Sequence, residues 1–186
     1  MPPSIKITKE EIIRTALGIV KKDGIKALNA RDIAAKIGCS TQPIFSNFSS
    51  MEELQLEVIK SANLLYEDCL KAETNRGEYP VYKASGMAYI KFAKEEKELF
   101  KLLFMRNQNK FPNFDQEQHF NNMLPLVKNN TGLDTDKTAL FHLEMWAFVH
   151  GIATMYATEY LNLELSLVSQ MLTDAYLGLK KQYGVN

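Results

Sequence analysis

The chain has 186 residues, 46% of them apolar, a composition typical of a globular protein that can bury a core of its own. Its 22 basic and 22 acidic side chains cancel, so the overall charge favours no particular partner. No apolar run is long enough to span a membrane, and the first residues lack a signal-peptide pattern, which together predict a cytoplasmic protein. The two cysteines, Cys39 and Cys69, have no metal-ligand spacing and are expected to be packed thiols.

The charge is unevenly distributed along the chain. The first 50 residues hold eight basic and four acidic side chains, so the remainder carries the opposite net charge. A basic N-terminal part suggests an anionic partner at this end, although chance alone can produce an asymmetry of this size.

Caps and glycines mark the first two expected helices. Thr8 and Glu11 have the spacing of a capping box, which predicts a helix start, and Gly24 favours the end of that helix. A second helix is expected to begin after Asn29, whose side chain can cap the first turn, and to end at Gly38. Apolar residues recur at helical spacing in both segments.

A third, shorter helix is expected after Gly38. Ser40 is its predicted cap, and Pro43 falls in its first turn, where the missing N–H is not needed. Ile44 and Phe48 lie four residues apart and share one face, which leaves the polar side chains of this segment on the other.

The rest of the chain also follows a helical period. Ser50 and Glu53 form another capping box, which predicts a long helix over residues 51–74. The segment NRGEYP, residues 75–80, is a break in composition and a candidate boundary. No stretch alternates as a strand does, so the fold is predicted to be all-α. Further helices are expected near residues 81–95, 97–105, 115–129, 136–160 and 163–182.

Two short helices that meet through a tight turn containing glycine are typical of a helix-turn-helix, whose second helix lies in the major groove of DNA. In this interpretation Ile33, Ile44 and Phe48 hold the two helices together. The other face of residues 41–47 then offers small polar groups to bases and phosphates. The alternative is an ordinary corner of two helices buried inside a bundle.

Residues 8–54, which contain the string "IA…GCS…IF…NF…EEL", resemble the N-terminal domain of the TetR family of transcription regulators. The resemblance implies a helix-turn-helix domain over residues 1–50 and a helical effector-binding and dimerisation domain over residues 51–186. It also implies core positions at Ile33, Ala34, Cys39, Ile44, Phe48 and Leu54. The expected DNA-binding residues are Ala30, Arg31, Lys36, Ser40, Thr41, Gln42, Phe45, Ser46 and Asn47.

Three positions depart from the family pattern. Phe45 stands where Tyr is usual, so a hydroxyl contact to phosphate is missing, although the ring can still pack on a thymine methyl or a sugar. Met51 replaces a frequent phosphate-binding Lys, and Asn47 stands where His or Tyr is common. Backbone contacts would then depend more on the remaining basic side chains. These are Lys6, Lys9, Arg31 and Lys36.

Residues 146–160, "WAFVHGIATMYATEY", resemble the group of this family whose penultimate helix carries a Trp…His-Gly signature. Gly151 weakens a helix interior, which suggests close approach of another helix or a ligand. His150 is either a satisfied core histidine or a ligand contact. Trp146 suits the core, a pocket wall or a dimer seam equally well.

Two further sites are expected in the C-terminal part. Methionines and aromatics, each of which also suits the core, would together line an adaptable apolar effector pocket. The pocket residues are expected to be Phe92, Phe104, Met123, Trp146, His150 and Met155. Two apolar stripes at helical spacing would suit a dimer seam in which two helices pair with their copies, and the alternative is that both stripes are plain core. The first stripe is Leu140, Leu143, Ala147 and Gly151, and the second is Leu165, Val168, Leu172, Tyr176 and Leu179.

These features predict a ligand-responsive regulator that binds a palindromic operator as a homodimer. It is expected to act as a repressor that a small apolar effector releases from DNA. The alternative is an all-α small-molecule-binding or interaction protein with the same fold that no longer binds DNA. Enzyme signatures such as HExxH, GxSxG, a P-loop or GxGxxG are missing from the sequence, so no catalytic residues, metal or cofactor are expected.

Overall fold

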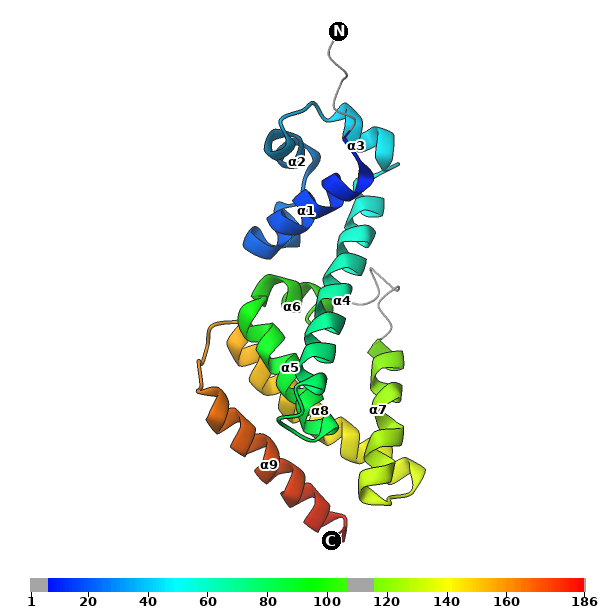
Figure 1. The fold of residues 1–186 in the computed structure, drawn as a ribbon, viewed down its shortest axis with the longest axis vertical. Coiled ribbons are helices and arrows are strands. Elements are labelled where there is room, and N and C mark those ends of the chain that lie inside the picture. The colour runs from blue at the N-terminus through cyan, green and yellow to red at the C-terminus, as the bar shows by residue number, and fades with distance from the viewer. Residues whose placement is uncertain (1–6, 107–115, 186) are drawn as a thin grey trace. The chain divides into compact units, whose positions relative to one another are not determined.

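A computed structural model of the chain describes residues 7–106 and 116–185, with side chains in the second range from residue 120. The described residues are mostly helical and contain no strand, which confirms the all-α prediction (Figure 1). The elements are α1 (Lys9–Asp23), the short 3-10 helix η1 (Ile25–Ala27), α2 (Ala30–Ile37), α3 (Gln42–Asn47), α4 (Met51–Asn75), α5 (Val81–Glu95), α6 (Lys97–Phe104), α7 (Gln116–Thr131), α8 (Thr135–Ala157) and α9 (Leu165–Gln182).

The predicted caps at the first two helices are present. The Glu11 amide donates a hydrogen bond of 3.1 Å to Thr8 Oγ1. The Thr8 side chain thus accepts from an N–H group that has no carbonyl partner within α1. Asn29 Oδ1 accepts in the same way from the Asp32 amide at 3.0 Å at the start of α2. Gly38 ends α2 in the left-handed conformation, with φ at 81°, where glycine is favoured.

The prediction of Ser40 as the cap of α3 is wrong. The cap position is Thr41, and no side chain bonds the helix there. Thr41 already has helical dihedral angles, φ −74° and ψ −13°, so the turn runs directly into the helix without an extended cap residue. Pro43 falls at the second position of α3, in the first turn as expected.

The described residues group into two compact units. The first comprises residues 7–65 and 98–106, and the second comprises residues 66–97 and 116–185. Helix α4 therefore contributes its first part to one unit and its second part to the other.

The core of the first unit is formed by the facing sides of α1 to α4. Five of the six expected core side chains are buried, whereas Cys39 is only half-buried. The buried ones are Ile33, Ala34, Ile44, Phe48 and Leu54. At the end of α1, Gly24 has φ at 77° and lies directly against the carboxylate of Glu98 on α6. A side chain at position 24 would be strained and would collide with that carboxylate.

The second unit is organised around α5, which packs mainly on α8 and also contacts α9. Gly86 permits this approach, since a Cβ there would lie 3.4 Å from Val149 and 3.6 Å from Leu172. The carboxylate of Glu73 is buried and accepts a 2.6 Å hydrogen bond from Lys91. In the part of the chain that the structure describes, no helix is both long and apolar enough to cross a membrane.

Candidate nucleic-acid interface and effector site

Helix α3 presents two different faces. Ile44 and Phe48 point into the core of the first unit, where they are 0% and 2% exposed. Gln42, Phe45 and Ser46 are exposed on the outward side. A buried apolar face of this kind fixes the helix rigidly and leaves the opposite face available to a partner.

Two of the outward polar side chains are already hydrogen-bonded within α3. Ser46 Oγ donates to the Gln42 carbonyl at 2.9 Å, and Asn47 Nδ2 donates to the Pro43 carbonyl at 2.8 Å. Both side chains therefore lie along their own helix instead of extending from it. Gln42 and Phe45 are the other exposed side chains of α3.

The remaining expected DNA-binding residues surround α3 within the same unit. Arg31 is exposed in the first turn of α2, and Lys36 is exposed in its last turn. Ser40 is exposed in the connecting turn, whereas Ala30 and Thr41 are half-buried. The structure therefore gathers these predicted residues onto α2, α3 and the turn between them; Lys6 lies outside the described residues.

One cluster at this interface was not predicted from the sequence. Glu53 Oε2 accepts 2.7 Å hydrogen bonds from both the amide and the hydroxyl of Ser49. Its other oxygen lies 3.5 Å from Lys9 Nζ, which also sits 4.8 Å from the centre of the Phe48 ring. The Ser49 hydrogen bonds, and to a smaller extent Lys9, lower the pKa of the Glu53 carboxyl. The cluster joins α1, the turn after α3, and α4.

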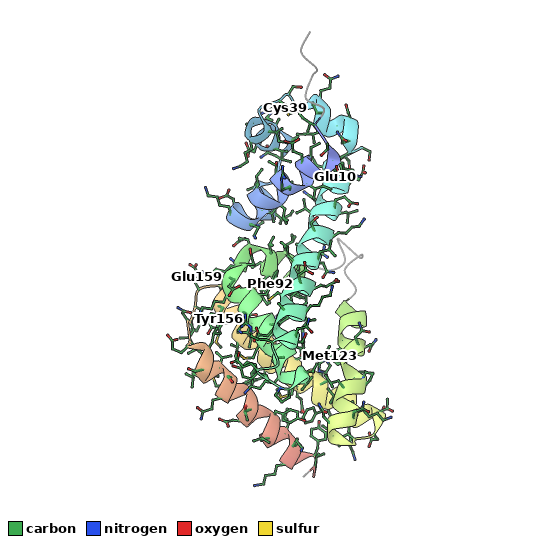
Figure 2. The ribbon with its side chains drawn as sticks, in the orientation of Figure 1. Glu10, Cys39, Phe92, Met123, Tyr156 and Glu159 are labelled. Atoms are coloured by element: carbon green, nitrogen blue, oxygen red, sulfur yellow. The ribbon has the colours of Figure 1, made fainter. Side chains whose placement is uncertain are left out.

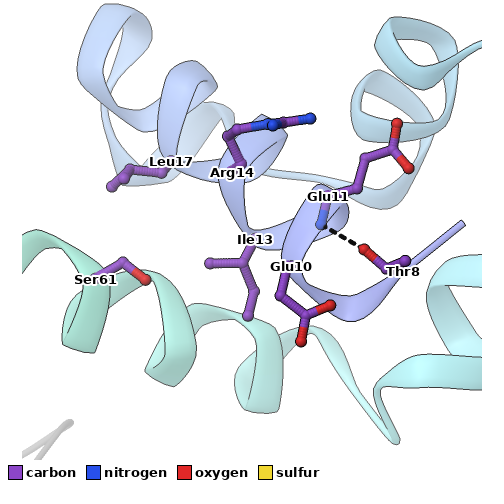
Figure 3. A pocket seen from close by; sticks show the side chains of 7 residues that line it. All are labelled: Thr8, Glu10, Glu11, Ile13, Arg14, Leu17 and Ser61. Atoms are coloured by element: carbon purple, nitrogen blue, oxygen red, sulfur yellow. Dashed lines mark hydrogen bonds between the residues drawn. The ribbon is translucent and has the colours of Figure 1, made fainter.

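A shallow cavity of about 640 Å³ also lies in the first unit, between α1 and α4 (Figure 3). Ile13 and Leu17 provide its apolar part, and Ser61 contributes from α4. The sequence did not indicate it, because its lining reads as the ordinary solvated side of an amphipathic helix. The other lining residues are Thr8, Glu10, Glu11 and Arg14.

In the second unit a continuous row of rings connects three of the expected effector residues. Phe92 packs on Tyr66 at 5.4 Å between ring centres, and Tyr66 on Tyr89 at 6.0 Å. Tyr89 Oη lies 2.8 Å from His150 Nδ1, and the His150 ring stacks on Trp146 at 5.0 Å. Burial lowers the pKa of His150, which favours the neutral ring. Tyr66 was missed, because nothing in its spacing separates it from other core aromatics.

A second histidine–tyrosine pair lies along the same two helices. Tyr82 Oη is 2.8 Å from His142 Nδ1, and the Phe120 ring packs 4.4 Å from the His142 ring. Burial lowers the pKa of His142 to about 4. Both pairs join α5 to α8, so neutral histidines help to hold the centre of this unit together.

The other expected pocket residues are not brought to the same place. Met155 is exposed and lies nine residues after Trp146, which is a half-integral number of helical turns and therefore the opposite flank of α8. Phe104 belongs to the first unit, where it packs on Phe100. Met123 comes from α7 of the second unit, outside the row of rings that the contacts define (Figure 2).

The proposed seam on α9 needs correction. Val168 and Leu172 are 0% and 3% exposed within the single chain, because this face of α9 packs on its own unit. Tyr176 packs on Phe141 at 5.5 Å, Leu179 belongs to the same apolar cluster, and Leu165 is half-buried. The other predicted stripe, on α8, lies on the outward face of its helix and is not covered by its own unit. A Cβ added at Gly151 in this stripe would meet no other atom within contact distance. The exposed residues of this stripe are Leu140, Leu143 and Ala147.

Within the described ranges, no group of three or more His, Cys, Asp or Glu side chains is arranged to hold a metal ion. His142 and His150 of the second unit are hydrogen-bonded to Tyr82 and Tyr89.

The comparison with protein families identifies residues 82–175, just over half of the chain, as a tetracyclin repressor-like C-terminal domain. The chain therefore belongs to the TetR family. A search of curated proteins finds no match.

Solved structures repeat the fold over nearly the whole chain. A protein of unknown function from Rhodococcus sp. RHA1 is 20% identical with a TM-score of 0.74, covering 100% of this chain and 99% of the other. A TetR-like transcriptional regulator from the same organism is 15% identical with a TM-score of 0.69, over 95% and 96%. The multidrug binding protein EbrR, complexed with imidazole, is 16% identical with a TM-score of 0.60, over 89% and 93%.

Proposed function

We propose that the chain is a ligand-responsive transcription regulator that binds a palindromic operator through α2 and α3. The observation that carries this proposal is the division of α3 into a buried apolar face and an outward face bearing Gln42 and Phe45. Membership of the TetR family supports it. A small apolar effector releases the protein from DNA, so it acts as a repressor.

Within this proposal the contacts divide by role. Gln42 forms a bidentate pair with adenine in the major groove, and Thr41 lies beside it. Arg31 and Lys36 flank α3 and bind phosphates, which position the helix without reading sequence. Residues 1–50 form the DNA-binding domain, and residues 51–186 form the effector and dimerisation domain.

A homodimer supplies the second half-site, because one helix-turn-helix buries too little DNA for tight specific binding. The exposed apolar stripe of α8 supports a seam there, in place of the buried face of α9. Leu140, Leu143 and Ala147 lie on that stripe, and Gly151 allows a second helix to approach closely.

The effector site is proposed at the row of rings that ends at Trp146. Trp146 is 38% exposed, so a flat apolar molecule can reach the indole without unfolding the core. The imidazole complex of EbrR, a protein of the same fold, supports small-molecule binding. The effector can change the free energy of operator binding only by the difference between its own binding free energies for the two conformations of the chain.

Selection of bound fragments from random duplex DNA tests this function. A palindromic consensus is expected, and Gln42→Ala should lose about 1–3 kcal/mol of discrimination at one position per half-site. Arg31→Ala should weaken all sequences alike and reduce the salt dependence of binding. Recovery of no enriched sequence would contradict DNA recognition.

That outcome would favour the alternative, a small-molecule-binding or interaction protein with the same fold. One observation supports it: α3 carries no charged side chain, and Ser46 and Asn47 bond their own helix. Such a protein would bind an apolar ligand near Trp146 and show no salt-dependent association with DNA.

A further inference from the structure

The cavity between α1 and α4 belongs to the first unit, whereas the row of rings that ends at Trp146 belongs to the second. Its volume of about 640 Å³ is large enough for a small organic molecule. Ile13 and Leu17 lie one turn apart on α1 and form its apolar floor. Both side chains are only half-buried, so a ligand can still cover apolar surface there.

The Glu10 carboxylate supplies a negative charge beside this floor. Glu10 and Arg14 are four residues apart on α1, which is the spacing of a favourable ion pair on a helix. Figure 3 shows instead that Glu10 points toward α4 together with Ile13, whereas Arg14 points away from α4. In residues 7–106 and 116–185, Glu10 forms no ion pair. The side of the cavity that faces α4 therefore combines an apolar floor with an uncompensated carboxylate.

The opposite wall of the cavity also presents an acceptor. Ser61 Oγ donates its proton to the Glu57 carbonyl at 3.0 Å, which leaves the oxygen lone pairs for other groups. Ser61 lines the same cavity, and Figure 3 draws it on the other side of Ile13 from Glu10. Ser61 can thus accept a hydrogen bond from a cation but has no proton left to donate to an anion. A ligand that suits both walls carries a positive charge on an apolar body.

We propose that this cavity binds a small alkylammonium ion, at a site separate from the operator and effector sites proposed above. The ammonium group donates to the Glu10 carboxylate, and the alkyl chain lies along Ile13 and Leu17. Glu10 and Leu17 are seven residues apart, about 10.5 Å along the axis of α1. An extended chain of about eight carbons spans the same distance.

The test follows the NMR signals of the Ile13 and Leu17 methyl groups in the full-length protein. Octylammonium chloride is added below the concentration at which it forms micelles, and both signals should shift and saturate together. Octanoate has a chain of the same length with the opposite charge and should bind more weakly. From butylammonium to octylammonium the affinity should rise about twofold per methylene, half the free energy of full burial, because the cavity is shallow. It should level off at decylammonium, whose chain extends past Leu17.

Two variants assign the head group to its carboxylate. Glu10→Gln should weaken octylammonium binding about two- to fivefold, which is the contribution of an exposed ion pair, and reduce the preference over octanoate. Glu52→Gln removes an exposed carboxylate from the first turn of α4, outside the cavity, and should leave the affinity unchanged.

Four results would overturn the inference. Shifts that spread equally to exposed methyl groups such as those of Leu167 and Leu177 would show adsorption of an amphiphile without a site. Equal binding of octanoate and octylammonium, or an unchanged affinity in Glu10→Gln, would exclude the role of the carboxylate. An affinity that still rises at decylammonium would exclude Leu17 as the end of the site. Each of these measurements is made without DNA, so the proposed operator binding is tested independently.

Discussion

Glu53 connects three segments of the first unit through one carboxylate. It accepts two hydrogen bonds from Ser49 and faces Lys9, which also lies over the Phe48 ring. The carboxylate is accessible to water, so the ion pair alone contributes little and the hydrogen bonds to the turn matter more. Its partner Ser49 lies in the turn directly after α3, so we expect the carboxylate to help fix the orientation of that helix.

Glu53→Gln should lower the melting temperature at neutral pH, and the difference from wild type should shrink in acid. The pKa of Glu53 is depressed in the folded chain, so its stabilisation is present above the ordinary pKa of glutamate. That contribution disappears as the pH falls through the lowered pKa of the folded state. Thermal melts between pH 7 and pH 3 measure it. Glu10→Gln, an exposed change of the same charge, is the control, and an equal effect at every pH would contradict the role of the carboxylate.

At the scale of elements, the centre of the second unit is the contact between α5 and α8 with its two histidine–tyrosine pairs. His142 is almost inaccessible, and burial lowers its pKa to about 4. In the unfolded chain the ring binds a proton near pH 6.5. The unfolded state therefore holds the extra proton between these values, and stability falls as the pH drops from 6.5 to 4.

His142→Gln should remove this part of the pH dependence while it retains a group that can hydrogen-bond Tyr82. Wild type should lose up to about 1.4 kcal/mol per pH unit more than the variant between pH 6.5 and 4. Urea unfolding at several pH values gives both free energies. If the two curves run parallel across this window, His142 is not neutral in the folded chain.

The sequence predicted the bounds of the helices better than it predicted the packing partners of their apolar faces. Helix α5 was expected at residues 81–95 and is found there, because a proline and a change in periodicity mark its ends. Helix α8 ends at Ala157, three residues early, where the chain turns and Glu159 takes a φ of 58°. On α9 the apolar period identified a buried face, but this face packs on its own unit and was wrongly assigned to a seam with a second copy. Burial by the same unit and burial by a second copy produce the same sequence pattern.

Side-chain directions in the site could not be predicted either. The spacing of Ile44 and Phe48 required one buried face, which the structure confirms. Whether Ser46 and Asn47 extend outward or bond their own helix depends on rotamers that residue types do not determine. The row from Phe92 to Trp146 likewise depends on Tyr66 and Tyr89, which come from two separate helices.

For the whole molecule, the assembly prediction depends on which apolar residues remain exposed. Leu143 is 47% exposed on α8, whereas Leu172 is 3% exposed on α9. Only the first is accessible to a second copy of the chain. The same substitution at the two positions should therefore have different consequences.

Leu143→Asp should yield a folded monomer that loses operator binding, because a charge is placed in the proposed seam. Leu172→Asp should instead destabilise the chain itself by roughly 4 kcal/mol or more, since it buries an unpaired charge. Light scattering and circular dichroism separate the two results. A folded Leu172→Asp monomer, or a Leu143→Asp variant that remains dimeric, would contradict the placement of the seam on α8.

The stack of Trp146 on His150 also gives the protein an optical signal of its own. Trp146 is the single tryptophan of the sequence, so the indole fluorescence comes entirely from this place. A protonated imidazole in contact with an excited indole accepts an electron and quenches its emission, whereas a neutral one does so far less. Because burial lowers the pKa of His150, we expect the emission to be brighter at neutral pH and to dim as acid protonates the ring. A molecule that separates the two rings changes the same emission, so occupancy of this place can be followed in unlabelled protein.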